Sequence, residues 1–234
     1  MNAPPHVPRA RGPGRLRLLL GVAFAVIAAA ATAVLPGTAK AATAICSNQT
    51  GTNGGFYYQM YTAGSGSACI TLNSGNSYSA SWSNIGDFVA GVGWNPGSNH
   101  TVSFSSSLSA SGTSLVSHYG WSTTPHVEYY VMENYTGAPP TAGTYMGQVT
   151  SDGGTYNIYE HQQVNQPSII GTATFEQYLD AWGGSSTGSN HTVTTGNHFS
   201  HWSNLGMKMG TFNYMILATE AYNGAIGEVN ATVW

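Results

Sequence analysis

Short runs in which apolar and polar residues alternate recur along the chain from Phe56 to the C-terminus. Examples are FYYQMYT, TVSFS, HVEYYVM, GTYNIYE and GEVNATVW, and the segments between such runs contain Asn-Gly, Asp-Gly, Gly-Ser and Pro-Gly pairs. A two-residue period is typical of β-strands with one buried face, and the intervening pairs are typical of hairpins and loops. The pattern therefore predicts an all-β protein, either a sandwich or a jelly roll.

One segment departs from this period. In residues 197–206, Phe199, Trp202 and Leu205 recur every three residues. This spacing predicts a short helix, with Asn197 as its N-cap and Gly206 at its end. We expect this helix to pack against a β-sheet.

Two of the predicted strands each carry one Glu that shares a face with Tyr residues. Glu128 shares its face with Tyr130 in residues 126–134, and Glu220 shares its face with Tyr214 and Tyr222 in residues 214–222. A Glu in a strand is usually a solvated surface residue, but both of these lie in otherwise apolar runs. If both strands face one groove, the two carboxyl groups would form the pair that glycoside hydrolysis requires.

The N-terminal region predicts a secretory signal peptide rather than part of the fold. Four Arg residues precede an apolar, Ala-rich run at residues 18–36, and Ala39-Lys40-Ala41 then offers a cleavage site between small residues. We therefore predict a signal peptide at residues 1–41 and a mature chain of one domain at residues 42–234. An uncleaved membrane anchor is the alternative.

The charge of the predicted mature chain narrows the range of partners. Five of the six basic residues precede Ala42, so Lys208 is the only one that remains, and one basic minus nine acidic residues gives a net charge of −8. A chain without Arg is poorly suited to bind phosphate backbones or anionic membranes. We therefore predict no nucleic-acid partner and no membrane partner after cleavage, and a neutral substrate fits better.

Cysteine and histidine usage point to an exported protein without a metal. Cys46 and Cys69 can pair in an oxidising compartment, although two buried thiols are the alternative. His198 and His201 lie three residues apart, but no third ligand has suitable spacing around them. We predict no metal site and no cofactor.

Long motifs distributed over the predicted mature chain resemble glycoside hydrolase family 11, the jelly-roll endo-β-1,4-xylanases. They include SWSNIGDFVAGVGWNPG at 81–97, HYGWSTTPHVEYYVMENY at 118–135, VNQPSIIGTATFEQY at 164–178 and NHFSHWSNLGMKMGTFNYMILATEAY at 197–222. The resemblance implies a β-jelly roll of two stacked, strongly curved antiparallel sheets that form a cleft, with one short α-helix. It also implies a secreted, extracellular, monomeric enzyme that hydrolyses internal bonds of xylan or xylo-oligosaccharides without a cofactor.

The resemblance assigns roles to the two Glu residues. Glu128 matches the nucleophile and Glu220 matches the acid/base of a retaining double displacement, which requires carboxyl groups about 5–5.5 Å apart. Burial and the charge of Glu128 are expected to raise the pKa of Glu220 and keep it protonated. Glu133 has the opposite parity to Glu128, so we expect it to face away from the cleft.

Further site residues follow from the same motifs. Asp87 matches a position that hydrogen-bonds the acid/base and accompanies an acidic pH optimum, although a turn cap after Gly86 is the alternative. Gln177 matches a residue that hydrogen-bonds sugar near the nucleophile, and Pro167 lies at the tip of the thumb loop. The cleft aromatics are matched by Tyr61, Tyr119, Tyr130, Tyr214 and Tyr222, although Tyr residues also simply pack β-sheets.

Several positions depart from the family pattern. Tyr61 replaces the usual Trp platform, Gln163 replaces the usual Arg before the thumb, and Ala221 replaces the Gly after the acid/base. Loss of the Arg removes a charge-assisted contact near the nucleophile. Two alternatives therefore stay open: a non-catalytic or weakly active xylan-binding jelly-roll protein, and a hydrolase of another β-1,4-glucan.

Overall fold

The structure of the protein is a computed structural model that describes residues 42, 44–183 and 191–234. The predicted signal peptide, residues 1–41, lies outside the described residues. The elements of the described chain are β1 (Ala44–Ile45), β2 (Gln49–Asn53), β3 (Phe56–Ala63), β4 (Ser67–Leu72), β5 (Ser77–Trp94), β6 (Thr101–Thr123), β7 (Val127–Thr136), β8 (Thr144–Ser151), β9 (Gly154–Ser168), β10 (Gly171–Trp182), β11 (His191–Thr194), α1 (Thr195–Asn204) and β12 (Thr211–Val233).

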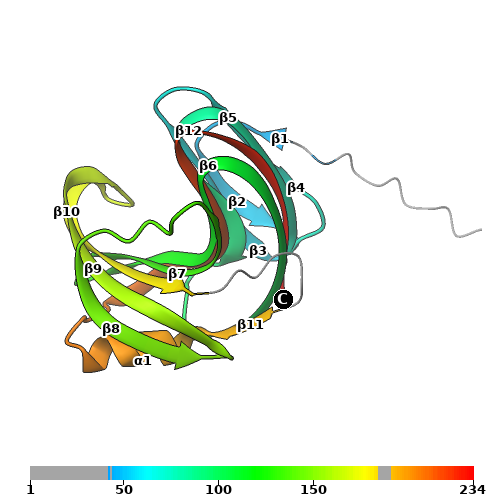
Figure 1. The fold of residues 1–234 in the computed structure, drawn as a ribbon. Coiled ribbons are helices and arrows are strands. Elements are labelled where there is room, and N and C mark those ends of the chain that lie inside the picture. The colour runs from blue at the N-terminus through cyan, green and yellow to red at the C-terminus, as the bar shows by residue number, and fades with distance from the viewer. Residues whose placement is uncertain (1–41, 43, 184–190) are drawn as a thin grey trace, which may run out of the picture. The chain divides into compact units, whose positions relative to one another are not determined.

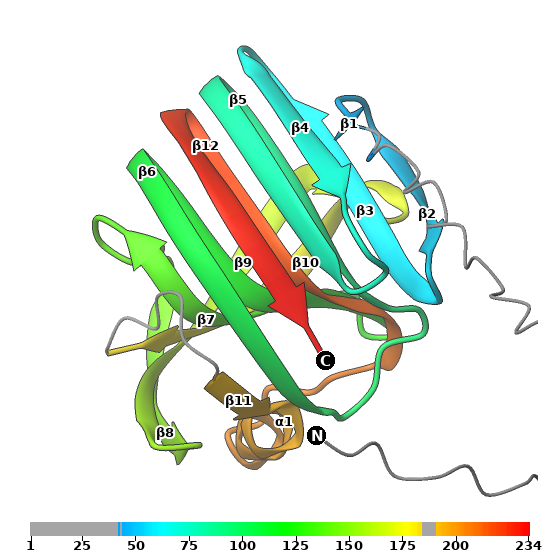
Figure 2. The same ribbon diagram turned by 90° about the vertical axis from the view of Figure 1, so that its right-hand side faces the viewer.

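Hydrogen bonds connect the described strands into one curved sheet. The main order is β1-β4-β5-β12-β6-β7-β10-β9-β8, while β3 joins β5, β2 joins β3, and β11 joins β6. The sheet folds over into two layers, so that β4, β5, β12 and β6 lie side by side in front of β7, β9 and β10 (Figure 1, Figure 2). The prediction of an all-β jelly roll with one short helix is confirmed.

One pair of strands departs from the antiparallel pairing that was predicted. β7 and β10 are parallel, with Gln177 opposite Glu128, whereas the other pairings between described strands are antiparallel. The connection after β7 leads to β8 at the far edge of the sheet, and two antiparallel reversals then bring β10 back beside β7. This return places Gln177 next to Glu128.

The long strands β5 and β12 contribute to both layers. Residues 78–83 of β5 pair with β4, whereas residues 87–93 pair with β3. In β12 the register shifts between Tyr222 and Ala225, and again before Gly227. Such bulges bend a strand, so β12 can pass from the cleft into the outer layer.

Buried side chains form two apolar clusters on opposite faces of the inner strands. In β7, Val127, Tyr129 and Val131 belong to the core between the layers. Tyr130 and Met132 belong to the second cluster, which also contains cleft residues. The predicted alternation of the two faces in this strand is confirmed.

The helix begins earlier than its sequence pattern predicts. Its N-cap is Thr194, so the prediction of Asn197 as N-cap is wrong. The backbone N–H and hydroxyl of Thr195 both donate to the carbonyl of His100, which satisfies the start of the helix through tertiary contacts. At the other end, Gly206 follows the helix with a left-handed φ of 86°, as predicted.

Cys46 and Cys69 are joined by a disulfide bond that ties the segment before β2 to β4. Among the described residues, no helix combines the length and the apolar character needed to cross a membrane. The same part of the chain contains no group of three or more His, Cys, Asp or Glu side chains arranged to hold a metal ion.

Candidate active site

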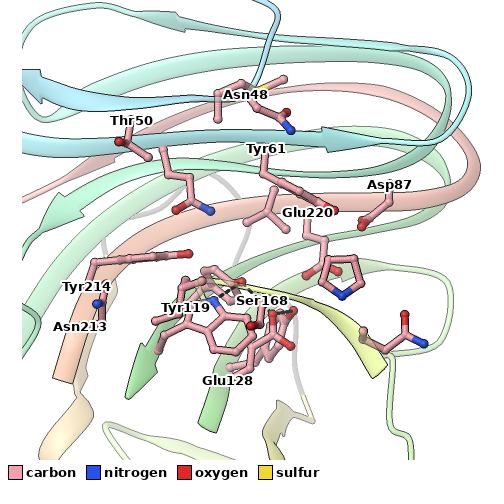
Figure 3. A pocket seen from close by; sticks show the side chains of 18 of the residues that line it. Asn48, Thr50, Tyr61, Asp87, Tyr119, Glu128, Ser168, Asn213, Tyr214 and Glu220 are labelled. Carbon is pink, nitrogen blue, oxygen red and sulfur yellow. Dashed lines mark hydrogen bonds between the residues drawn. The ribbon is translucent and has the colours of Figure 1, made fainter. Parts of the chain in front are cut away.

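A cleft of about 640 Å³ is lined by side chains from β2, β3, β5, β6, β7, β9, β10 and β12. Glu128 and Glu220 project into it from different strands, with Asp87 beside Glu220 (Figure 3). The strands that carry these residues are far apart in sequence but are joined through β6 and β12 in the sheet. The fold therefore brings the two predicted carboxyl groups to one cleft.

Glu128 is buried on the cleft floor and is held by three donors. The hydroxyls of Tyr119 and Tyr130 donate to its Oε1 at 2.7 and 3.1 Å, and Nε2 of Gln177 donates to its Oε2 at 2.6 Å. The strand register explains these contacts, because Gln177 lies opposite Glu128 and Tyr119 lies opposite Tyr130. Three donors around one carboxyl group favour its ionised form, which only accepts hydrogen bonds.

Glu220 lies on β12, opposite Val89 of β5 and Leu115 of β6. Its Oε2 accepts no hydrogen bond from the described side chains. Desolvation by the surrounding protein, followed by the charges of Asp87 and Glu128, raises its pKa well above the ordinary value. A contact with the Tyr130 hydroxyl acts in the opposite direction and lowers the pKa.

The environments of Glu128 and Glu220 favour different protonation states. Burial raises the pKa of Glu128 as well, but its hydrogen bonds from Gln177, Tyr119 and Tyr130 oppose this rise. Glu220 lacks a comparable set of donors and is raised further. Two carboxyl groups whose environments separate their pKa values are suited to act as an anionic group and a proton donor.

Asp87 lines the cleft from within β5, so it is not a turn cap. The predicted hydrogen bond to Glu220 is absent between these two described residues. Tyr222, not Glu220, lies directly opposite Asp87, which makes Asp87 and Glu220 diagonal neighbours on adjacent strands. The two carboxyl groups interact through their charges, since diagonal residues lie about 7–8 Å apart and long side chains can reach across that spacing.

The other predicted binding residues meet at the cleft with one exception. Its lining includes Tyr61, Tyr119, Tyr130, Tyr214, Gln177 and Pro167. Tyr222 lies outside the lining and is half-buried where β12 begins to bulge. Burial and the charges of Glu220 and Asp87 raise the pKa of Tyr222 to about 12, so it still borders the carboxyl pair.

The cleft also contains residues that the sequence motifs did not single out. Strand parity could have identified Gln59, Trp121 and Phe175, because each lies two residues from a predicted cleft residue. Trp121 donates from Nε1 to the hydroxyl of Tyr119 at 2.7 Å, and this leaves the Tyr119 proton for Glu128. Asn213 and the β2 residues that line the cleft carried no comparable signal.

Glu133 faces away from the cleft, as its parity predicts. It is fully buried, and the Tyr156 hydroxyl lies within 3.1–3.2 Å of both of its oxygens. Nε2 of His191 lies 3.4 Å from Oε2 of Glu133. These contacts belong to the core between the layers, so the role of Glu133 is structural.

Comparison with known proteins identifies the family. The family model described as glycosyl hydrolases family 11 matches residues 53–232, which is most of the chain. The chain belongs to glycosyl hydrolase family 11. This result agrees with the resemblance that the sequence motifs indicated. The jelly roll, and the cleft with its two Glu residues, agree with it as well.

Named relatives of this family 11 hydrolase are xylanases. It is 50% identical over 187 residues to endo-1,4-beta-xylanase B of Phanerodontia chrysosporium, and 49% identical over 206 residues to ethylene-inducing xylanase 1 of Botryotinia fuckeliana. It is 47% identical over 191 residues to endo-1,4-beta-xylanase 2 of Rhizopus oryzae. The alignments cover 79%, 86% and 81% of this chain and 63%, 73% and 87% of these relatives, respectively.

Proposed function

We propose that this family 11 hydrolase is a secreted endo-1,4-β-xylanase that cleaves internal β-1,4-xylosidic bonds with retention of configuration. The observation that carries the proposal is one cleft with two unlike carboxyl groups, Glu128 held by three donors and Glu220 favoured in its protonated form. The names of the relatives support xylan as the substrate.

In the proposed mechanism, Glu128 is the nucleophile and Glu220 is the acid/base. Glu128 attacks the anomeric carbon while Glu220 protonates the departing oxygen, which releases one part of the xylan chain and leaves the other esterified to Glu128. The ester carries no charge, so the pKa of Glu220 falls. Glu220 then takes a proton from water, which attacks the anomeric carbon and frees Glu128.

Substrate binding in this proposal depends on aromatic and amide side chains. Tyr61, Tyr119, Tyr130 and Tyr214 supply flat apolar surfaces and hydroxyl groups for sugar rings. Gln177 contacts sugar beside the nucleophile, and Pro167 forms part of the thumb at the β9–β10 turn. A cleft that contains no Lys or Arg among its lining residues suits a neutral polysaccharide.

Acid adaptation through Asp87 is part of the proposal. When Glu220 donates its proton it becomes anionic, and a negative charge on nearby Asp87 opposes that change. A protonated Asp87 does not, so activity falls as Asp87 ionises and the optimum is acidic. Burial raises the pKa of Asp87, which extends the range in which the neutral form is present.

Two features support the proposal that the protein is exported: the predicted signal peptide and the disulfide bond. Residues 1–41 would act as the signal peptide, and residues 42–234 would be the extracellular, monomeric catalytic domain. The disulfide between Cys46 and Cys69 supports this proposal, because such bonds persist in oxidising compartments.

The test is reducing-sugar release from xylan between pH 3 and 8 by the protein produced from the full chain, beside Glu128→Gln. We expect release by the wild type and a loss of at least about 10³-fold in the variant, since the covalent step has no nucleophile. Cellulose assayed in parallel separates a xylanase from a hydrolase of another β-1,4-glucan. Absence of release at every pH, with xylan binding intact in both proteins, would instead support a binding protein.

A further inference from the structure

Behind Gln177 the cleft contains a second amide that the mechanism above does not use. Nε2 of Gln163, on β9, donates to Oε1 of Gln177 at 3.0 Å, and Nε2 of Gln177 donates to Oε2 of Glu128 at 2.6 Å. Gln163 pairs with Phe175 in the β9–β10 register, which makes it a diagonal neighbour of Gln177. Gln163 and Gln177 are both half-buried and both line the cleft.

Hydrogen-bond chemistry sets the direction of this chain of amides. An ionised Glu128 can only accept, so Gln177 must turn its NH2 group toward the carboxylate. The carbonyl oxygen of Gln177 then points the other way and requires a donor. Gln163 supplies that donor, and its own orientation is thereby determined as well.

Rotating the Gln177 amide by 180° would leave the shape of the side chain unchanged but would exchange the positions of its donor and its acceptor. A flipped amide would place its carbonyl oxygen against Oε2 of Glu128 and its NH2 group against Nε2 of Gln163. The contact with Glu128 would be repulsive, as would the contact with Gln163 while its NH2 group faces Gln177, and Glu128 would lose one of its three donors. The ionised Glu128 sets the preferred state of Gln177, and Gln163 stabilises that state further by donating to the carbonyl oxygen that it leaves facing away from Glu128.

We propose that Gln163 is a positioning residue that holds the Gln177 amide in the orientation that donates to Glu128. The inference rests on the proposed function to the extent that Glu128 is the nucleophile. In the common family pattern, Arg occupies the position of Gln163. In this chain, that position holds a neutral donor that acts through Gln177. This role does not require Gln163 to contact the substrate.

The test is a direct titration of Glu128 by NMR of protein labelled with 13C at the Glu carboxyl carbons. The full chain contains six Glu residues, and loss of one signal in Glu128→Gln assigns that of Glu128. In Gln163→Met, which keeps the length of the side chain but cannot donate, we expect the pKa of Glu128 to rise. The matched control is Gln162→Met, because the neighbouring Gln162 donates to Glu176 away from the cleft and its loss should leave Glu128 unchanged.

A double-mutant cycle tests whether Gln163 acts through Gln177. In a Gln177→Met background, adding Gln163→Met should produce no further shift in the titration of Glu128. An unchanged titration in Gln163→Met alone would overturn the proposal. An equal shift with and without Gln177 would overturn it too, because the effect would then not pass through the amide.

Kinetics on an aryl β-xylobioside keep this inference separate from the proposed function. We expect kcat/KM of Gln163→Met to fall about 3- to 10-fold, with the acidic limb of its pH profile shifted to higher pH. An inactive wild type would overturn the proposed function, whereas the NMR titration would still decide the role of Gln163.

Discussion

Tyr130 stands between the two carboxyl groups of the cleft. Its hydroxyl donates to Oε1 of Glu128 at 3.1 Å, and its proximity lowers the pKa of Glu220. A hydroxyl has one proton to donate, so it can serve one carboxylate fully at a time. In the glycosyl-enzyme of the proposed mechanism, Glu128 would be an ester and a weaker acceptor, which would free the Tyr130 proton for Glu220 at the stage when Glu220 is to act as a base.

At the same scale, Asp87→Asn should move the pH optimum to higher pH. Under the proposed acid adaptation, the alkaline limb of the wild type follows the ionisation of Asp87, whereas Asn is neutral at every pH. The limb of the variant then follows Glu220, whose pKa stays raised by burial and by Glu128 after the charge of Asp87 is removed. The measurement is the pH profile of kcat/KM from pH 3 to 8.

The opposite outcome has a clear physical meaning. The charge of Asp87 raises the pKa values of both Glu128 and Glu220. If this effect alone controlled the pH profile, Asp87→Asn would move both limbs of the profile to lower pH, and the optimum would become more acidic. Such a shift would contradict acid adaptation through Asp87 and leave the two Glu roles unaffected.

Among the elements, α1 is anchored to the strand that also carries Gln177. Asp180 of β10 accepts from Nε1 of Trp202 at 2.8 Å and contacts Nδ1 of His198 at 2.6 Å. All three side chains are completely buried. A buried carboxylate requires such partners, and they link the helix to the back of the cleft strand.

We expect Asp180→Ala to destabilise the protein by about 3–5 kcal/mol, since it leaves the indole N–H buried without its acceptor and the imidazole buried without its partner. Urea unfolding at pH 6 measures the change. The control is Glu228→Ala, an exposed carboxylate on β12, which should alter stability by no more than about 0.5 kcal/mol. Equal effects of the two substitutions would show that the buried contacts do not anchor the helix.

At the scale of the whole molecule, six of the nine acidic side chains have raised pKa values. Burial is the first cause for each of Asp87, Glu128, Glu133, Glu160, Asp180 and Glu220. Each retains its proton in the folded protein at a pH where the unfolded chain has released it. Folding stability therefore falls as pH rises from the ordinary carboxyl range through these raised values.

Fewer groups act in the opposite direction. Burial lowers the pKa of His118 to about 3 and also lowers that of His100, so the unfolded chain takes up their protons more readily than the folded chain below about pH 6.5. The pKa of Asp152 is lowered by hydrogen bonds from Ser151 and Thr194 that outweigh its partial burial, so its contribution is lost as pH falls. On folding, the six carboxyl groups and His191, whose pKa is also raised, take up protons, whereas His118, His100 and Asp152 release them.

We therefore expect the protein to be more stable at pH 5 than at pH 7. A net uptake of about one proton corresponds to about 1.4 kcal/mol per pH unit. Urea midpoints at both pH values measure the difference, and Glu220→Gln should reduce it by raising stability at pH 7. A protein that is more stable at pH 7 than at pH 5 would contradict the prediction.

Local patterns in the sequence determined much of what is observed here. The two-residue period predicted the all-β class and the faces of the strands around Glu128 and Glu220. The three-residue spacing of Phe199, Trp202 and Leu205 predicted the helix and its end at Gly206. These features depend on the conformation of a few consecutive residues, which their own side chains largely dictate.

Only the tertiary structure decided which residues from distant strands meet. The parallel β7–β10 pair brings Gln177 to Glu128, the register of β5 and β12 leaves Asp87 diagonal to Glu220, and the bulge after Tyr222 takes that residue out of the cleft lining. The contact between Gln163 and Gln177 has the same origin. Register and bulges follow from the packing of the whole sheet, because a strand's own period is compatible with several alignments against its neighbours.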